Sequence, residues 1–349
     1  MKTKAGFSLV ELMVGMTIGL LTVLVVVNVL GVADARRRTT TNGADAVTNA
    51  QLALYTVERD GKSAGYGLAT VRSALGCDLH ISYKLAQRPG SHALAPVQIT
   101  DGPGGSADTL AFLNNLPGDV AQSTRIMLAH PLNDTGFFVQ SDLAARTGDL
   151  MLAVPRDPFD PARAPTWCTS FAVTDVVAGA NRFMHDGVSD WNMPVTSSIM
   201  PPAGYLAGDY LINLGRLRQR IYDINEASLR LRELDLAGIP IASGATASSA
   251  AGSGMYANIV QLQAVYGKDT NNDGVVDAWN ATAPLGPAWQ QVIALRVALV
   301  ARSQKREPEL VTADGAATCA DPVPPPAALC WHPDPAAPAQ KIDVSSVAG

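Results

Sequence analysis

The sequence predicts an α+β fold in which one long N-terminal helix packs against an antiparallel β-sheet in an enlarged head. Three observations support this prediction. Residues 12–33 contain no ionisable side chain, apolar residues then recur at helical spacing as far as residue 57, and the remaining chain alternates short apolar segments with Gly, Pro, Asn and Asp. The first two patterns are typical of a continuous helix, and the third is typical of short strands joined by turns.

The first half of the predicted helix, residues 7–33, has the length and composition of a membrane span. Glu11 is its one charged residue and Asn28 its other strongly polar one. The 22 residues from Leu12 to Ala33 would form about 33 Å of helix, which is enough to cross the hydrocarbon core of a bilayer. We therefore expect residues 7–33 to lie in a membrane or in the core of an assembly.

Three other interpretations of this segment are open, and the least favoured is a buried helix in a soluble protein. A secretory signal peptide could be cut after Ala33-Asp34-Ala35, although its apolar region would far exceed the usual 7–15 residues. An ordinary single-pass anchor would leave Glu11 without a role, at a cost of about 2.5–3.5 kcal/mol in the bilayer. The buried carboxylate is better explained by a partner that neutralises it.

Residues 34–60 are expected to continue the helix as an amphipathic stem. Its apolar positions recur at steps of three and four residues: Ala44, Val47, Ala50, Leu54 and Val57. The stem should end near Gly61, because Gly61, Gly65 and Gly67 all disfavour helix. The arginines at 36–38 stand on the head side of the span, so the distribution of positive charge does not itself fix the orientation.

The segment Gly6-Phe7-Ser8-Leu9-Val10-Glu11-Leu12 resembles the processing signature of type IV prepilins and type II secretion pseudopilins. The resemblance implies a leader of residues 1–6, a prepilin peptidase that cuts after Gly6, and methylation of the new N-terminus at Phe7. It also implies that Glu11 meets the terminal amine of a neighbouring subunit. Two opposite charges in an apolar solvent cost less together than apart.

Two glycines support close helix association in this segment. Gly15 and Gly19 form a small-xxx-small pair, which allows the backbone of a second helix to approach closely. We therefore assign Glu11, Gly15 and Gly19 to assembly and assign no catalytic role to any of them.

The head, residues 61–349, contains several predicted strands and turns. The clearest strands are 108–113, 148–154, 169–174, 208–214, 216–224 and 292–301. In the last of these, Ile293, Leu295, Val297 and Leu299 share one face, which predicts a strand buried against the stem.

Phrases spread over most of the chain also resemble the PilW family of minor pilins. They are Gly65–Gly67, Asp108–Leu110, Gly148–Leu150, Asn213–Gly215 and Ile293–Ser303. The resemblance implies a pilin-like subunit that helps to initiate or cap a type IV pilus, first held in the inner membrane with its head in the periplasm and later exposed on the cell surface. Its partners would be other pilins, the prepilin peptidase, the assembly platform and membrane lipid. The alternatives are a type II secretion pseudopilin and a pilus-tip adhesin or DNA-binding subunit.

One loop in the head has the spacing of a calcium site. Asp269, Asn271 and Asp273 supply oxygens at positions 1, 3 and 5 of an EF-hand pattern, Gly274 follows at 6, Val275 offers its carbonyl at 7, and Asp277 stands at 9. Position 12 is Asn280 instead of the usual glutamate, so the pattern is incomplete. A solvated turn is the alternative, but three carboxylates in nine residues favour a calcium ion.

The four cysteines are predicted to form disulfides in a head outside the cytoplasm. Cys319 and Cys330 flank a short Pro-rich segment, and the loop they would close is similar to the C-terminal disulfide loop of pilins. Cys77 would then pair with Cys168. Four cysteines allow three connectivities, so the pairing is a prediction.

Composition and motifs favour a protein that is not an enzyme. The net charge is −5 with 16% charged residues, which is too acidic for a general nucleic-acid binder. No GxSxG or HExxH motif occurs, and the five histidines have no ligand spacing, so we expect solvated histidines. Arg216, Arg218 and Arg220 alternate along one predicted strand. They could contact DNA phosphates, but we favour a charged sheet face near Asp223 and Glu226.

Overall fold

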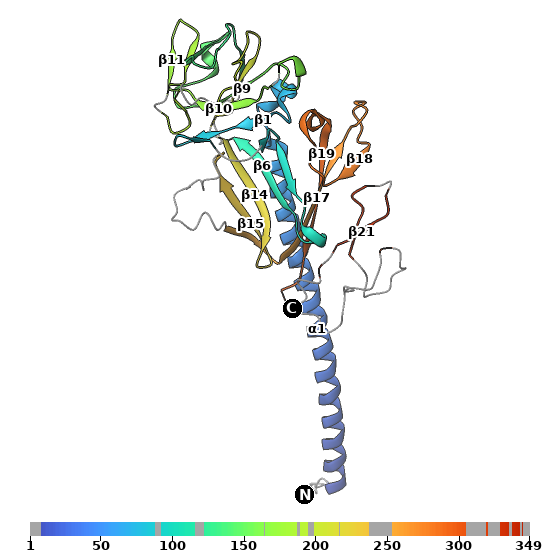
Figure 1. Cartoon of the computed structure of the whole chain (residues 1–349). Helices are drawn as coiled ribbons and strands as arrows, with labels where there is room; N and C mark the ends of the chain where they lie inside the picture. Colours follow the sequence, from blue (N-terminus) through green and yellow to red (C-terminus); the bar gives the residue numbers. More distant parts are fainter. Residues whose placement is uncertain are drawn as a thin grey trace.

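The structure, a computed structural model, is dominated by one helix that projects from a β-rich head (Figure 1). It describes residues 8–87, 92–115, 122–163, 165–186, 189–194, 199–215, 217–236, 253–304, 319, 329–334, 337–342 and 344. The predicted α+β class, with a long N-terminal helix and a head of mainly antiparallel sheets, is confirmed.

Helix α1 spans Leu9–Ser63 without a break. At 1.5 Å per residue its 55 residues extend about 80 Å. Every large apolar side chain from Leu9 to Val32 is at least 50% exposed, whereas Ala53 and Val57 are buried in the head. The helix ends slightly beyond the predicted Gly61, where a Cβ would lie 3.3 Å from the ring of Phe112. Glycine at this position allows the end of the stem to approach the sheet closely.

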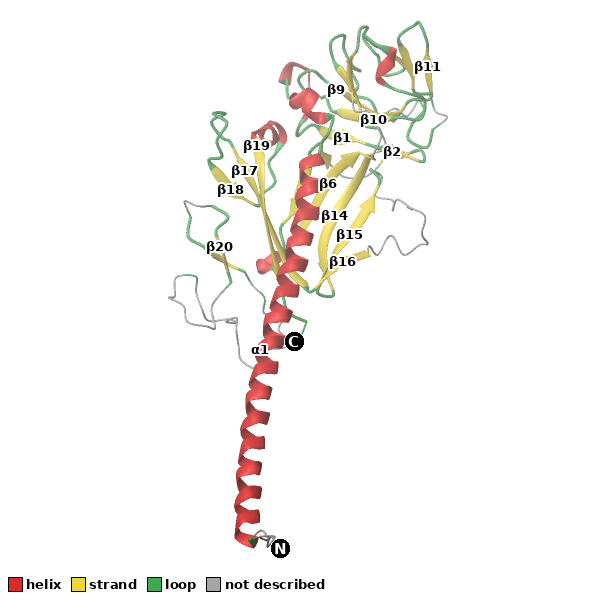
Figure 2. Cartoon of the chain, turned by 180° about the vertical axis from the view of Figure 1, so that it is seen from behind, coloured by secondary structure: helices red, strands yellow, loops and turns green. Residues whose placement is uncertain are grey.

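The part of the head beside α1 consists of two antiparallel sheets. A five-stranded sheet has the order β16-β15-β14-β6-β5, and a three-stranded sheet has the order β18-β17-β19. Helix α1 lies against both of them (Figure 2). The strands are β5 (Val97–Thr100), β6 (Thr109–Asn115), β14 (Leu217–Asn225), β15 (Ser228–Leu234), β16 (Ser253–Ala257), β17 (Ile259–Lys268), β18 (Ala278–Asn280) and β19 (Val292–Ala301).

One hydrophobic core joins the stem to both sheets. Ala53 and Val57 of α1 pack in a cluster with Phe112 on β6, Tyr222 on β14 and Leu262 on β17. Burial of these apolar side chains supplies the main attraction between helix and head. The predicted apolar face of the stem is therefore only partly correct. Val57 is buried and Ala50 is half-buried, but the other three predicted positions are exposed, namely Ala44, Val47 and Leu54.

A second lobe lies beyond the C-terminal end of α1 (Figure 1). Its six-stranded sheet has the order β4-β1-β10-β9-β13-β7, and a three-stranded sheet β11-β12-β8 lies beside it. The strands are β1 (Asp78–His80), β4 (His92–Ala93), β7 (Gln122–Arg125), β8 (Gly136–Phe138), β9 (Leu150–Val154), β10 (Cys168–Ala172), β11 (Asp175–Val177), β12 (Arg182–Met184) and β13 (Tyr210–Asn213). The pairing of β1 with β10 is parallel, so the head is not purely antiparallel.

Short elements complete the described chain. They are the ribbons β2 (Ser82–Tyr83) with β3 (Ala86–Gln87) and β20 (Cys330–Trp331) with β21 (Gln340–Lys341), and the 3-10 turns η1 (Leu68–Ala74), η2 (Pro103–Gly105), η3 (Asp142–Ala144), η4 (Pro161–Arg163) and η7 (Gly286–Gln291).

The predicted strands all coincide with observed ones, but burial was misjudged in one. Strand β19 has the predicted bounds and contacts α1. It is half-buried over most of its length, and Ile293 is 42% exposed. The reason is its position at the edge of a narrow three-stranded sheet, where one edge of the strand has no neighbouring strand among the described residues.

Candidate functional site

The apolar half of α1 presents a bare surface on which the predicted assembly residues lie. Glu11 is exposed in the first turn, and its side chain has no ion-pair partner among the described residues. A Cβ added at Gly15 or Gly19 would meet no atom within 4 Å, so both glycines leave the helix backbone accessible. Gly6 and Phe7, the predicted processing residues, lie outside the described residues.

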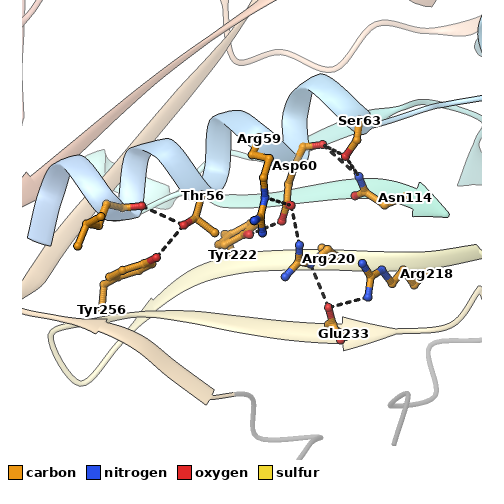
Figure 3. A network of polar contacts seen from close by, with 11 residues as sticks. Thr56, Arg59, Asp60, Ser63, Asn114, Arg218, Arg220, Tyr222, Glu233 and Tyr256 are labelled. Carbon is orange, nitrogen blue, oxygen red and sulfur yellow. Dashed lines mark hydrogen bonds and ion pairs between the residues drawn. The ribbon is translucent and has the colours of Figure 1, made fainter. Parts of the chain in front are cut away.

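The opposite end of α1 is held by a buried carboxylate that the sequence did not reveal. Asp60 is 3% exposed. Its Oδ1 accepts a hydrogen bond from Nη1 of Arg220 on β14 at 2.6 Å, and its Oδ2 accepts one from the hydroxyl of Tyr222 (Figure 3). Burial, and then the hydrogen bond to Asp60, raise the pKa of Tyr222 and keep its hydroxyl protonated as a donor. We call Asp60, Arg220 and Tyr222 the Asp60 clamp.

Further polar contacts surround the clamp and fix the register of the helix on the sheet. Asn114 on β6 donates through Nδ2 to the carbonyl of Asp60 at 3.1 Å and to Oγ of Ser63 at 2.7 Å. One turn earlier, the hydroxyls of Thr56 and Tyr256 are 2.7 Å apart (Figure 3). These partners come from β6, β14 and β16, so three strands contribute to one face of α1.

Arg218 and Arg220 do lie on a charged sheet face, as predicted. Their partners, however, are Glu233 and Asp60 and not the expected Asp223 and Glu226. Arg220 lies 3.0 Å from Glu233 and Arg218 lies 3.2 Å from the same carboxylate, in addition to the contact between Arg220 and Asp60. Arg216 lies outside the described residues. Because Arg218 and Arg220 are largely buried and paired with carboxylates, they are not available to DNA phosphates.

The opposite face of the same sheet carries a separate ion cluster. Asp223 accepts hydrogen bonds from Arg230 at 2.7 and 2.8 Å and from Arg232 at 3.0 Å. Successive side chains of a strand point to opposite faces, so Asp223 is directed away from Arg220. The expectation that the arginine face lies near Asp223 was therefore wrong for Arg220, because Asp223 is on the opposite face of the strand.

The predicted calcium loop follows β17 and is closed by its own hydrogen bonds. Asp269 is 4% exposed, and its carboxylate accepts from the backbone N–H groups of Asp273 at 3.1 Å and Gly274 at 2.8 Å. Asp277 accepts from the N–H and the hydroxyl of Thr270 at 2.7 and 2.8 Å. These contacts, the hydroxyl above all, lower the pKa of Asp277. The loop is thus a compact turn in which hydrogen bonds favour the ionised form of Asp277.

The ligand set of this loop is partial. In the residues that the structure describes, no group of three His, Cys, Asp or Glu side chains is arranged to hold a metal ion. Asn280 at position 12 lies in β18 and accepts a hydrogen bond from Lys268 at 2.7 Å, so it does not face the loop as an EF-hand glutamate does. A cavity of about 430 Å³, lined in part by Asp269, Asn272 and Gly274, adjoins the loop.

Two comparisons with known families bear on these features. Residues 221–329 match the family "Type IV Pilus-assembly protein W" (PilW), and residues 1–27 match the "Prokaryotic N-terminal methylation motif". In these two segments the chain is similar to PilW-family prepilins. No curated protein and no solved structure matches it. The two matches support a minor pilin associated with a type IV pilus, and the domains of these families are structural.

The match to PilW covers the sheets beside α1 more than the second lobe. It includes most of β14 and all of β15 to β19, and therefore contains Tyr222 of the Asp60 clamp and the Asp269 loop, whereas Arg220 lies one residue before it. The second lobe, built from strands before residue 214, lies outside both matches.

A tyrosine and a glycine lead into the Asp269 loop in the PilW-like region, and both have structural roles. The hydroxyl of Tyr266 accepts a hydrogen bond from the N–H of Ile99 at 2.6 Å, which ties β17 to β5. A Cβ at Gly267 would lie 2.8 Å from the ring of Trp279. Glycine lets that ring lie across β17, and the guanidinium of Arg296 then stacks on it at 3.8 Å from the ring centroid.

The structure contains two disulfides. Cys77 is bonded to Cys168, which joins β1 to β10 in the second lobe, and Cys319 is bonded to Cys330 at the start of β20. The Cα atoms are 5.9 and 5.7 Å apart, within the usual range. These are the pairs named from the sequence, and no described cysteine is free.

The expectation of solvated histidines was wrong for two of the five. Nε2 of His130 and Nε2 of His185 are 2.8 Å apart in the core of the second lobe, and the His130 ring stacks on Phe137 with centroids 3.8 Å apart. Burial lowers the pKa of His130 to about 4 and that of His185 to about 3. They are separated by 55 residues, so no local spacing could have indicated the pair.

Proposed function

We propose that this chain is a minor pilin that is inserted in the inner membrane through the first half of α1, cleaved after Gly6, methylated at Phe7 and built into a type IV pilus. The observation that carries the proposal is the exposed apolar surface from Leu9 to Val32, because such a surface requires a membrane or other helices to cover it. The match to the N-terminal methylation motif supports this assembly over an ordinary anchor.

The proposed mechanism has two steps that use different ends of α1. In the membrane, leader removal creates a positive amine on Phe7, and Glu11 of an incoming subunit pairs with the amine of its neighbour. The ion pair forms where water is scarce, so its formation selects one register between helices. The Asp60 clamp keeps the head attached while the helix is extracted, because the buried charges would be costly to separate.

The proposed partners are other pilins, the prepilin peptidase, the inner-membrane assembly platform and membrane lipid, with the head in the periplasm before assembly. A type II secretion pseudopilin shares the N-terminal features, so the location of the mature chain is decisive. The adhesin or DNA-binding alternative has less support, because Arg218 and Arg220 are engaged within the protein.

We also propose that the Asp269 loop binds calcium. Five positions offer oxygen ligands, namely Asp269, Asn271, Asp273, the carbonyl of Val275, and Asp277. The support is the concentration of three carboxylates in nine residues, which repel each other without a cation. The missing position-12 carboxylate points to a weak site.

The mature N-terminus tests the main proposal. Mass spectrometry of the full chain purified from its membrane should identify methyl-Phe7 as the first residue, and a chain starting at Arg36 would contradict the proposal.

The role of Glu11 is tested by the variant Glu11→Ala. The leader of this variant should be cleaved normally, but the variant should be absent from sheared fibres. Glu58→Ala is a matched control, since Glu58 is exposed on the same helix and its one ion-pair partner among the described residues is Lys62. Recovery of Glu11→Ala in fibres at the normal level would rule out the role of Glu11.

A further inference from the structure

Three consecutive arginines follow the apolar half of α1, and the assembly steps above give them no role. Arg36, Arg37 and Arg38 are exposed and lie within unbroken helix. Arg38 pairs with Asp34 one turn below at 2.6 Å. Among the described residues, no side chain forms an ion pair or hydrogen bond with the guanidinium of Arg36 or Arg37. The helix therefore carries two unpaired positive charges at one level.

That level corresponds to the headgroup layer of a bilayer. The uncharged stretch ends at Ala33, and Arg36 to Arg38 lie about 5–8 Å further along the axis. The headgroup region adds about the same thickness to each side of the hydrocarbon core. Long arginine side chains can also extend toward phosphates from a backbone that lies somewhat deeper.

The three arginines are spread around the helix, and this favours a ligand that surrounds the helix, such as lipid headgroups, over a single neighbouring protein surface. Consecutive helical residues are about 100° apart, so residues 36–38 span about 200° of the circumference. A neighbouring helix contacts one stripe and could reach only part of this arc. Lipid headgroups surround a membrane helix on all sides, and a guanidinium binds phosphate by charge and by paired N–H donors.

We propose that Arg36 and Arg37 bind the phosphate groups of anionic phospholipids and hold α1 at a fixed depth before assembly. Arg38 contributes chiefly by neutralising Asp34, which would otherwise repel the same headgroups. This proposal rests on membrane insertion of residues 7–33. Its consequence is that extraction into a fibre must break these phosphate contacts, so the pair acts as a retention point on the head side of the membrane.

Lipid selectivity of the full chain tests the proposal. The chain is extracted in mild detergent from vesicles with equal phosphatidylglycerol and phosphatidylcholine, and the retained lipids are counted by native mass spectrometry. An arginine near an anionic surface contributes about five-fold in affinity, so Arg36→Gln/Arg37→Gln should reduce the preference for phosphatidylglycerol about 25-fold. All the changed side chains are exposed, so the variant should fold normally.

The matched control is Arg59→Gln/Lys62→Gln, which removes the same charge from exposed positions of the same helix beside the head. It should retain the wild-type preference. Equal retention of the two lipids by the wild-type chain, or an unchanged preference in Arg36→Gln/Arg37→Gln, would overturn the proposal.

Self-association in phosphatidylcholine nanodiscs is the second readout. If self-association falls in Arg36→Gln/Arg37→Gln and not in the control, the arginines bind an acidic protein face, and the lipid proposal is wrong. Neither readout depends on cleavage at Gly6, so failure here is distinguishable from failure of the proposed function, which the mature N-terminus tests separately.

Discussion

The carboxylate of Asp60 lies 2.6 Å from Nη1 of Arg220, and this contact joins the last turn of a 55-residue helix to the middle of a β-sheet. The two residues are 160 positions apart. Both side chains are largely buried, and the hydroxyl of Tyr222 donates a hydrogen bond to the second carboxylate oxygen of Asp60. The stem is thus attached to the head by apolar packing and by a polar contact that specifies its position along the helix axis.

Asp60→Ala should destabilise the head by about 3 kcal/mol, since it leaves a buried guanidinium without its main partner. This loss of stability should lie at the low end of the range for breaking a buried ion pair, because Glu233 remains 3.0 Å from Arg220. Thermal unfolding of the full chain in detergent, followed by tryptophan fluorescence, measures the change.

A double-mutant cycle isolates the interaction between the two residues. Asp60→Ala/Arg220→Ala should cost less than the sum of the two single variants. Lys62→Ala is the control, because it removes a fully exposed partner of Glu58 and should leave unfolding unchanged. Strictly additive losses would show that Asp60 and Arg220 do not act as a pair.

Acidification should destabilise the second lobe through His130 and His185. Their folded pKa values, about 4 and about 3, lie below the ordinary 6.5, so the unfolded chain binds more protons between these limits. The contribution of the two neutral histidines to stability is therefore fully present above pH 6.5, and it is lost as the pH drops from 6.5 toward 3. Melting temperature measured from pH 7.5 to 4 should decline.

The pH effect has a matched pair of variants. His130→Gln cannot titrate and should flatten the decline, even if it lowers stability at pH 7.5. His332→Gln changes an exposed histidine and should leave the profile as in the wild type. The charged neighbours Asp134, Asp186 and Arg182 are unaltered in both. A profile for His130→Gln as steep as that of the wild type would assign the acid sensitivity elsewhere.

The two disulfides should differ in their contribution to stability. In the chain-entropy description, a bond that closes about 90 residues is worth about 4–5 kcal/mol and one that closes about 11 residues is worth about 3 kcal/mol. The separations are 91 and 11 residues. Cys77→Ala/Cys168→Ala should therefore lower the melting temperature more than Cys319→Ala/Cys330→Ala, and the reverse order would contradict this reasoning.

Calcium should raise the melting temperature of the chelator-treated full chain if the Asp269 loop binds it. Millimolar calcium should produce the shift, and magnesium a smaller one, because magnesium requires a stricter octahedral geometry. Asp273→Asn removes one proposed ligand charge and should abolish most of the response. An unchanged melting curve in calcium would show that the loop is a hydrogen-bonded turn only.

Much of the architecture could be predicted because it depends on local patterns. The apolar run and its helical continuation were sufficient to predict α1, and the signature from Gly6 to Leu12 was sufficient to indicate its use. The strands were found because short apolar segments stand between turn residues. The Asp269 loop was found for the same reason, since all its predicted ligands lie within nine positions.

Contacts between distant residues could not be predicted in this way. The arginine face was expected near Asp223 and Glu226, but strand geometry directs Asp223 to the face opposite Arg220. The histidine pair was missed because His130 and His185 meet only when β-strands of the second lobe assemble. The half-burial of β19 was missed because sequence alternation does not reveal that a strand lies at a sheet edge.

The sequence by itself thus determined a long helix with an apolar first half, a prepilin-type N-terminus, a β-rich head and one acidic loop. The tertiary structure decided that α1 is fixed by Asp60, that Arg220 binds this carboxylate while Arg218 pairs with Glu233, and that two histidines are buried together. The physical reason is that periodicity and short motifs act over neighbouring residues, whereas the pairing of a buried charge depends on which strands the fold brings beside it.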